Sequence, residues 1–410
     1  MQNKIKIAFI KTGGLTSGGT EKFLQTVAIN LPKDKFEVDY YYSEPVITKN
    51  PDKEPLSFID ADKIKLMESR DVNLIKFNLD YVDLGTYTHN WINTDFWTKF
   101  SEDRYDIIQT GRAGNPEYPF YKIKKTPIID SLHLSGMVDN QYNISRVMHI
   151  CQWNADKWIK SGGDKERVVI ISHPMDIKFN GGDLKEEYSI GSKFVFGFHQ
   201  RNEDSIFSDI PLRAYKKVES ENNIFIILGG SNKYREQARG LGIKNIIFID
   251  HNSDSQFIYR FLNTLNVYAH GRKDGEVNST AMAEALYFGC PVISNFSEIN
   301  NGHVECIGSA GSVFSNVDDY AQELQKIQND RHYYTYLSQE AKKRFTEKYE
   351  LNGQMDNIIN IYKEVLKNPF PKKIRRIYYH FINFLLKRIL INKYNYNFLR
   401  KVRDGFKKNI

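Results

Sequence analysis

The sequence is poor in cysteine and contains no long apolar run. Three of its 410 residues are cysteine, and Cys151, Cys290 and Cys306 are too scattered for a disulfide framework or a zinc knuckle, so we expect them in the core. No stretch reaches the roughly 18 to 20 uninterrupted apolar residues that a membrane-spanning helix requires. The opening residues MQNKIKIAFIKTGG are typical of a short strand rather than a signal peptide. These features predict a cytoplasmic protein.

Acidic residues are scarce at the C-terminal end. From Lys367 to Ile410 the chain has thirteen Lys or Arg and one acid, Asp404, which gives this segment a charge of +12. Since the whole chain carries +7, the 366 residues before the segment carry −5. The segment 367–410 is therefore a basic tail on a mildly acidic body, and the two need separate explanations.

The basic tail has the composition of a helix that lies on a membrane surface. Apolar residues at Ile377, Phe381, Phe384 and Leu385 follow three- and four-residue steps. Basic residues flank them and tyrosines suit the headgroup boundary: Lys372, Lys373, Arg375, Arg376, Lys387, Arg388, Tyr378, Tyr379, Tyr394 and Tyr396. We expect the tail to bind an anionic membrane surface and to hold the protein peripherally at the inner face of the membrane. A helix packed on the N-terminal domain is the alternative.

The length and the apolar pattern predict two domains. A chain of 410 residues exceeds one ordinary core. Short apolar runs alternate with helical segments, and the pattern restarts in the second half: IKIAFI, FEVDYYYS, YDIIQT, TPIIDSLH and VMHICQ, then FVFGFHQ, NNIFIILGG, KNIIFID, LNVYAHG and CPVIS. Such alternation indicates parallel sheets wound with helices. The predicted fold class is α/β, with two doubly wound, Rossmann-like domains.

We place the N-terminal domain at residues 1–175, the C-terminal domain at 176–352, and a helix that crosses back to the first domain at 353–366. Ligands of doubly wound sheets bind at the carboxyl ends of the strands. We therefore expect the functional site in a cleft that the two domains face.

The stretch EVNSTAMAEALYFGCPVIS contains two carboxylates, Glu276 and Glu284, with seven residues between them. Residues 279–288 suit a helix, Gly289 suits a left-handed stop, and Pro291 prevents continuation. The residues PVIS then indicate a buried strand.

The first turn of this helix can be capped by Asn278, Ser279 or Thr280. Glu276 then lies just before a helix N-terminus, which favours anions, and Glu284 lies about one to two turns further along. Such a site could bind a phosphate with its amides and hydroxyls with its carboxylates. The alternative is an ordinary helix with one capping and one solvated glutamate.

These residues resemble the E-x7-E segment of the nucleotide-sugar glycosyltransferases of the GT-B fold, in particular the retaining glycosyltransferase family 4. The resemblance covers roughly residues 1–365. It implies that Glu284 binds the ribose hydroxyls of a nucleotide-sugar and that Glu276 addresses the donor sugar. The backbone amides that follow would face the donor's phosphates: Val277, Asn278, Ser279 and Thr280.

Two segments of the N-terminal domain resemble the same family. KTGGLTSGGTEKF is similar to its glycine-rich loop, so that the backbone at Gly18 and Gly19, and at Gly13 and Gly14 before them, would approach donor or acceptor. IIDSLHLSG is similar to the strand end where the family places a histidine beside the transferred sugar. This points to His133 as a catalytic residue, and a purely structural histidine is the alternative.

VFGFHQRNEDSIF resembles the family's Gly-Arg segment and points to Arg201 as the group that neutralises the diphosphate, because a guanidinium can bind two phosphate oxygens. The chain departs from the family where Ser-Ile-Phe at 205–207 replaces an expected lysine, and where Val-Asn-Ser replaces Gly-Phe-Gly after Glu276. Arg272 and Lys273 are candidates for the missing phosphate contact. Solvated side chains in a polar loop are the alternative for both.

The resemblance implies a retaining transfer of a sugar from a nucleoside diphosphate, which we expect to be UDP, to a hydroxyl of a lipid-linked glycan, lipopolysaccharide or capsule. The leaving phosphate would help to take the acceptor's proton, so we expect no general base, no metal and no other cofactor. Asp60 and Asp62 form a competing D-x-D metal motif, which we place in a turn. A nucleotide-sugar 2-epimerase, a DNA glucosyltransferase and a non-catalytic donor-binding subunit are the alternatives. Only the second would give the tail a nucleic-acid partner.

Overall fold

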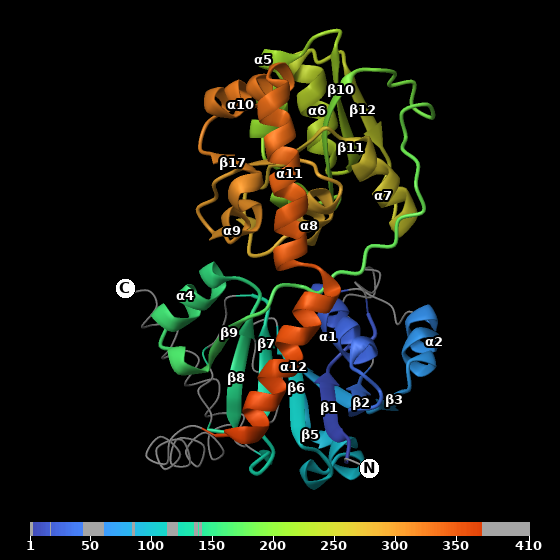
Figure 1. The fold of residues 1–410 in the computed structure, drawn as a ribbon, viewed down its shortest axis with the longest axis vertical. Helices are drawn as coiled ribbons and strands as arrows, with labels where there is room; N and C mark the ends of the chain where they lie inside the picture. Colours follow the sequence, from blue (N-terminus) through green and yellow to red (C-terminus); the bar gives the residue numbers. More distant parts are fainter. Residues whose placement is uncertain are drawn as a thin grey trace. The chain divides into compact units, whose positions relative to one another are not determined.

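Two compact units are present in the computed structural model of the chain (Figure 1). The residues that the structure describes are 3–16, 18–43, 61–83, 87–112, 122–134, 138 and 142–370. The first unit comprises Met1–Ile150, Asn154–Ile171 and the chain from Met355 onward, and the second comprises Cys151–Trp153 and Ser172–Gln354. Residues 371–410, which hold nearly all of the expected membrane tail, lie outside the described residues.

The first unit is built on a seven-stranded parallel sheet in the order β3-β2-β1-β6-β7-β8-β9. Its strands are β1 (Ile5–Lys11), β2 (Phe36–Tyr42), β3 (Val72–Lys76), β6 (Ile107–Arg112), β7 (Ile128–Leu132), β8 (Ile144–His149) and β9 (Val168–Ile170). The helices of this part of the chain are α1 (Gly19–Asn30), α2 (Ala61–Ser69), α3 (Phe96–Lys99), α4 (Gln152–Lys160) and α12 (Leu351–Lys367). An antiparallel pair, β4 (Leu79–Asp83) and β5 (Tyr87–Thr94), forms a second sheet.

The second unit is built on a six-stranded parallel sheet in the order β12-β11-β10-β13-β15-β17. Its strands are β10 (Phe194–Gln200), β11 (Asn223–Gly229), β12 (Ile246–Ile249), β13 (Val267–Ala269), β15 (Val292–Asn295) and β17 (Gly311–Phe314), with a short pair β14 (Gly275–Glu276) and β16 (Asn300–Asn301). Its helices are α5 (Ile210–Val218), α6 (Asn232–Leu241), α7 (Ser255–Thr264), α8 (Thr280–Tyr287), α9 (His303–Ile307), α10 (Val317–Asn329) and α11 (Arg331–Lys348).

The predicted fold class is confirmed, since each unit is a doubly wound α/β domain with a parallel main sheet. The run FVFGFHQ is β10 residue for residue. The three cysteines form no disulfide and are buried, as expected. The sequence pattern does not predict the outer strands β3 and β17, because half-buried residues and, in β17, an initial glycine weaken their apolar signal.

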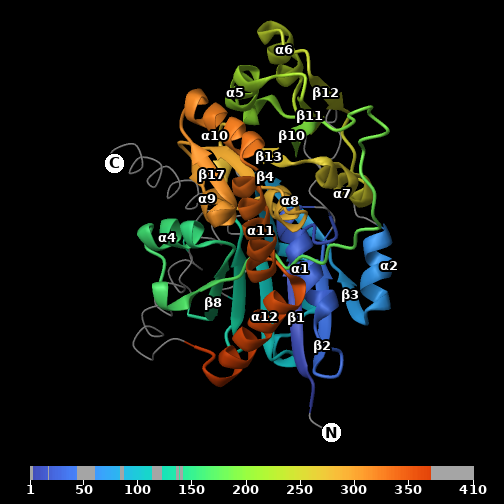
Figure 2. The same cartoon turned by 45° about the horizontal axis from the view of Figure 1, so that its top comes forward.

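Helix α12 lies against the sheet of the first unit in both views (Figures 1 and 2). The hydroxyl of its Tyr362 donates a hydrogen bond of 3.1 Å to Oε1 of Gln109 in β6. The ring of Tyr362 also contacts Phe36 at the start of β2. The segment 353–366, which the sequence assigns to a returning helix, is thus helical, and its buried tyrosine is part of the first core.

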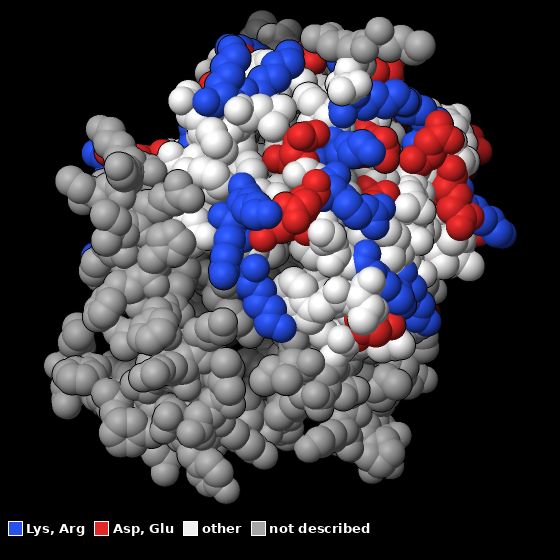
Figure 3. All heavy atoms as spheres, turned by 90° about the horizontal axis from the view of Figure 1, so that it is seen from below, with Lys and Arg blue, Asp and Glu red and all other residues white. Residues whose placement is uncertain are grey.

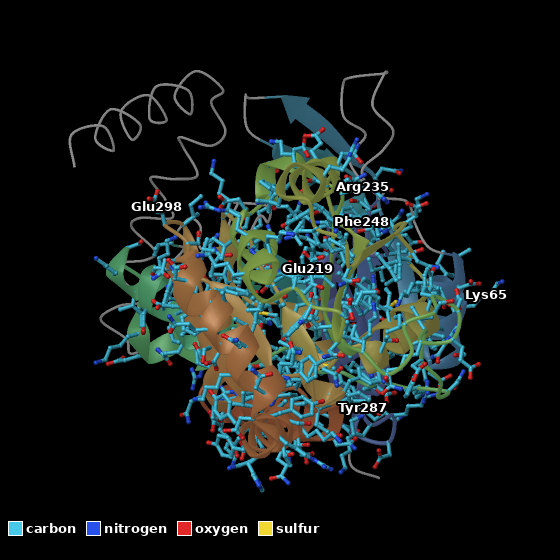
Figure 4. The ribbon with its side chains drawn as sticks, turned by 90° about the horizontal axis from the view of Figure 1, so that it is seen from above. Lys65, Glu219, Arg235, Phe248, Tyr287 and Glu298 are labelled. Atoms are coloured by element: carbon cyan, nitrogen blue, oxygen red, sulfur yellow. The ribbon has the colours of Figure 1, made fainter. Side chains whose placement is uncertain are left out.

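Charged side chains join neighbouring elements of the second unit. The guanidinium of Arg235 in α6 lies 4.7 Å from the ring centroid of Phe248 in β12, and the two are labelled side by side in Figure 4. The carboxylate of Glu219, which follows α5, accepts hydrogen bonds from the backbone N–H groups of Lys244 and Asn245 at 2.5 and 2.7 Å. These contacts hold β12 at the edge of the sheet.

Acidic and basic side chains are mixed over the described part of the face in Figure 3. Exposed ion pairs of the first unit, such as Lys33 with Asp71 and Lys125 with Asp103, likewise place acidic and basic side chains next to each other. No helix among the described residues is long and apolar enough to cross a membrane. Because acidic and basic side chains are mixed, the described part of the face in Figure 3 shows no large surface of one charge.

Candidate active site

The second sheet has a topological switch point between β10 and β13. These strands pair in parallel, with Phe196 opposite Val267, but the chain continues from β10 toward β11 and β12 on one side and from β13 toward β15 and β17 on the other. Arg201 directly follows β10, and Arg272 follows β13 by a few residues. Both therefore start from the carboxyl edge of the sheet, where such folds bind ligands.

Helix α8 begins as the sequence predicts. Ser279 is its N-cap, and the Oγ of Ser279 accepts a hydrogen bond of 3.3 Å from the backbone N–H of Met282. Thr280 is the first helical residue, and Gly289 has a positive φ of 74° after the helix end. Of the three possible caps, Ser279 is therefore the one used.

Glu284 lies in α8 and is buried, with 8% of its surface exposed. Its Oε2 lies 3.7 Å from Nε2 of His199, near the end of β10. Burial, followed by the negative charge of Glu284, raises the pKa of Tyr259 in α7 to about 12. The carboxylate therefore points toward the carboxyl edge of the sheet, and the alternative of a solvated glutamate at this position is wrong.

Glu276 ends the short strand β14, and its carboxylate is mostly shielded from solvent. Its Oε1 accepts a hydrogen bond of 2.9 Å from Nη1 of Arg272. The same guanidinium donates through Nε and Nη2 to both carboxylate oxygens of Asp274, each at 2.7 Å. Arg272 is thus mostly buried and held between two acids, while Lys273 is exposed, and a phosphate contact of either residue stays a prediction.

Burial and charge oppose each other at these two acids. Burial raises the pKa of Glu276 above its ordinary value, although Arg272 offsets part of this shift. Burial also tends to raise the pKa of Asp274, but the Arg272 guanidinium has the larger combined effect and holds this pKa below its ordinary value. The positive charge of Arg201 opposes the effect of burial on the pKa of both acids, as Arg272 does. The charge of Arg201 is therefore close enough to act on the carboxylates of Asp274 and Glu276.

Arg201 itself is exposed, and its Nη2 lies 3.4 Å from Oε2 of Glu203. Its side chain is 65% accessible, and an ion pair of this exposure is worth little, about 0 to 1 kcal/mol. An incoming anion can displace Glu203 at small cost. Arg201 is consequently the more accessible of the two guanidinium groups.

The three residues that replace Gly-Phe-Gly are each engaged by the second unit. The carbonyl of Val277 accepts a hydrogen bond of 3.1 Å from Sγ of Cys151, Oδ1 of Asn278 accepts one of 3.4 Å from the hydroxyl of Tyr349, and Ser279 caps α8. The departure from the family motif therefore leaves an ordered loop.

Two residues at this edge are not predicted by the sequence. His199 has a local signal, since it lies two positions before Arg201 at a strand end. Asp274 has a clearer one, because Arg-Lys-Asp-Gly-Glu at 272–276 places two basic residues directly before two acidic ones within a turn-forming segment. The contact between Asp274 and Arg272 is local and could have been anticipated from this pattern.

The predicted residues of the first unit surround the start of α1 and the end of β7. Gly18 precedes α1 and Gly19 is its first residue. A Cβ on Gly18 would lie 2.1 Å from Oε2 of Glu21, so this carboxylate occupies the space beside the helix N-terminus, where it also pairs with Lys11 at 3.1 Å. A Cβ on Gly19 would meet no atom within 4 Å. The N-terminus of α1 is therefore already close to a carboxylate of its own chain.

His133 directly follows β7 and is buried, with 6% of its surface exposed. Its ring packs edge-on against Phe23 of α1, with ring centroids 5.0 Å apart. Its proposed place beside a sugar stays a prediction.

The second aspartate of the D-x-D motif lies in a helix and not in a turn. Asp62 lies in the first turn of α2 and is almost fully exposed beside Lys65, and Asp60 lies outside the described residues. Over the described parts of the chain, no group of three His, Cys, Asp or Glu side chains could hold a metal ion.

The fold and the second unit are similar to known glycosyltransferases. The family model for glycosyl transferases group 1 matches residues 208–344, which include Glu276 and Glu284. No curated protein matches the chain in sequence.

Several solved structures share the fold. A glycosyltransferase from Rickettsia africae has 15% identity and a TM-score of 0.68, over 89% of this chain and 100% of the other. HepE from Anabaena, in complex with UDP and glucose, has 17% identity and a TM-score of 0.62, over 88% and 100%. The lipopolysaccharide outer core galactosyltransferase WaaB has 14% identity and a TM-score of 0.61, over 88% and 100%. The chain therefore has the fold of GT-B glycosyltransferases.

Proposed function

We propose that the protein is a retaining glycosyltransferase that moves a sugar from a UDP-sugar to a hydroxyl acceptor. The observation that carries this proposal is the placement of Glu276 and Glu284 around the start of α8, beside the switch point of the second sheet. The match to group 1 glycosyl transferases over this segment supports it.

In this proposal Glu284 binds the ribose and Glu276 binds the donor sugar. The N–H groups from Val277 to Thr280 face the diphosphate, since the first amides of a helix have no partner within the helix and its N-terminus attracts anions. Arg201 supplies the mobile positive charge. Arg272 is assigned to Glu276 instead of to phosphate, because three of its five N–H groups already bind two carboxylates.

The demanding step is departure of the diphosphate. The bond between the anomeric carbon and the phosphate oxygen breaks, the acceptor oxygen bonds to the same face of the sugar, and the acceptor's proton passes to the leaving phosphate. Negative charge then grows on the phosphate oxygens, where Arg201 and the α8 amides stabilise it without a metal. His133 is assigned a place beside the transferred sugar.

For the acceptor we propose a lipid-linked glycan, lipopolysaccharide or capsule precursor at the inner face of a membrane. The similarity of fold to WaaB, a galactosyltransferase of the lipopolysaccharide outer core, supports this class. The basic aromatic composition of residues 367–410 supports binding to an anionic surface.

A non-catalytic donor-binding subunit is the second candidate. It is favoured by the engagement of Arg272 with Asp274 and Glu276, which leaves Arg201 as the main charge for the diphosphate. Turnover of the donor separates the two candidates, since both would bind it.

A screen of nucleotide-sugars by thermal unfolding, followed by an assay for released UDP, tests the proposal. A ligand at one hundred times its Kd stabilises the folded state by about 2.7 kcal/mol. We expect UDP and one UDP-sugar to raise Tm and that sugar to be turned over. Stabilisation without turnover, with glycolipid acceptors present, would favour the donor-binding subunit, and no response to any nucleotide would contradict both.

A further inference from the structure

Arg272 is shared by two carboxylates, only one of which has a role in the proposed reaction. We propose that Asp274 is a positioning residue: it fixes the guanidinium of Arg272, and Arg272 in turn orients Glu276 toward the donor sugar. The inference rests on the proposed function for the identity of the ligand. The contacts among the three side chains stand independently of it.

The two hydrogen bonds to Asp274 fix the orientation of the Arg272 guanidinium. Nε and Nη2 of Arg272 bind the two oxygens of Asp274, each at 2.7 Å. A guanidinium is planar and rigid, so two parallel hydrogen bonds on one side also fix the direction of the remaining N–H groups. Nη1 is directed at Oε1 of Glu276, 2.9 Å away.

The backbone that carries this arrangement is itself fixed. Asn295, at the end of β15, accepts from the N–H of Arg272 at 2.8 Å and donates to its carbonyl at 3.1 Å. Asn300 donates to the carbonyl of Asp274 at 3.1 Å, and the N–H of Lys273 binds the carbonyl of Ile206 at 3.2 Å. The turn is thus held from three elements, and little conformational freedom is left to lose when a ligand binds.

As a consequence, the two carboxylate oxygens of Glu276 differ in their contacts. Oε1 is taken by Arg272, whereas Oε2 receives no hydrogen bond from any described residue. Burial by itself favours the protonated acid, and Arg272 counteracts it. An oriented, ionised Glu276 can accept a hydroxyl hydrogen bond at Oε2, which a rotating or protonated one does less well.

Two variants test the positioning role, with a matched control. Asp274→Asn keeps the size of the side chain but removes the paired charge, and Arg272→Lys keeps the positive charge but removes the fork. Asp318→Asn, which breaks an exposed ion pair with Lys217 on the same unit, is the control. The probes are UDP and a panel of UDP-glucose, UDP-galactose and UDP-N-acetylglucosamine.

For the sugar that the wild type accepts, we expect Asp274→Asn and Arg272→Lys to lower kcat or sugar-dependent affinity by about 10- to 100-fold, with the Kd of plain UDP changed by less than about twofold. Asp318→Asn should match the wild type. An equal loss of UDP and UDP-sugar binding would show a merely structural role and overturn the proposal. So would unchanged turnover in both variants.

A measurement without ligand separates this inference from the proposed function. In ¹⁵N NMR spectra of the arginine side chains, we expect the wild type to show slow rotation about Nε–Cζ of Arg272 and Asp274→Asn to show fast rotation. If the wild type binds none of the probes, the proposed function fails, and this measurement still decides the role of Asp274: rotation that stays slow in Asp274→Asn overturns it.

Discussion

Glu284→Gln should weaken the binding of UDP itself, before any sugar is transferred. Glu284 is buried in α8 at the carboxyl edge of the second sheet, and glutamine has nearly the same shape, so no cavity is created. What is lost is the charge that assists hydrogen bonds from the ribose hydroxyls. A hydrogen bond to a charged group contributes about 1.5 to 3 kcal/mol, which corresponds to a Kd for UDP raised about 10- to 150-fold.

Calorimetric titration of UDP into the wild type, Glu284→Gln and Glu276→Gln measures this effect. Glu276→Gln is the matched control, because its carboxylate is assigned to the sugar and UDP has none. Its Kd for UDP should stay within about twofold of the wild type, whereas its turnover of UDP-sugar should fall. Thermal unfolding without ligand identifies any loss of folded protein. Equal UDP affinity in the wild type and Glu284→Gln would refute the ribose assignment.

Three further outcomes are expected. Transfer should survive EDTA, because the charge of the diphosphate is assigned to Arg201 and backbone amides; loss of activity that Mn²⁺ restores would reopen the role of Asp60 and Asp62. Deleting residues 371–410 should release the protein from anionic liposomes in a cosedimentation assay and leave UDP binding intact, and unchanged sedimentation would show that the tail is not the anchor. Gly275→Ala should lower Tm by several degrees in thermal unfolding, because Gly275 has a φ of 64° and an added Cβ would lie 1.8 Å from the carbonyl oxygen of Asn300; an unchanged Tm would mean that the β14–β16 pair rearranges freely.

Most of the fold could be predicted because fully buried parallel strands are continuous apolar runs. In β10 the residues Val195, Phe196 and Phe198 are completely inaccessible, and the run FVFGFHQ needs no other signal. The edge strand β17 is different, since all four of its residues are only partly buried. Its position depends on pairing with β15, a contact between distant parts of the chain that no local pattern encodes.

The site could be predicted only in part, for a similar reason. The spacing of Glu276 and Glu284 around a helix start is a local feature and was sufficient to locate both. The spacing alone could not show that Arg272 is held by Asp274, because the local signal for that contact is the mixed charge of residues 272–276 and not the distance between the two glutamates. Nor could it show that Asn295 fixes the turn, since that contact joins residues 23 positions apart.

The charges at this edge of the second sheet indicate how a diphosphate would have to be held. Two guanidinium groups, of Arg201 and Arg272, form ion pairs with three carboxylates, of Glu203, Asp274 and Glu276. Because the acids offset the cations, long-range attraction for an anion is weak here. Under the proposed function, affinity must then come from short-range contacts: the amides at the start of α8 and the ribose held by Glu284. Under the same proposal, Ser-Ile-Phe at 205–207 supplies no lysine to the diphosphate, so Glu284 must contribute more of the donor's binding energy, and plain UDP is a sharper probe of this site than any sugar.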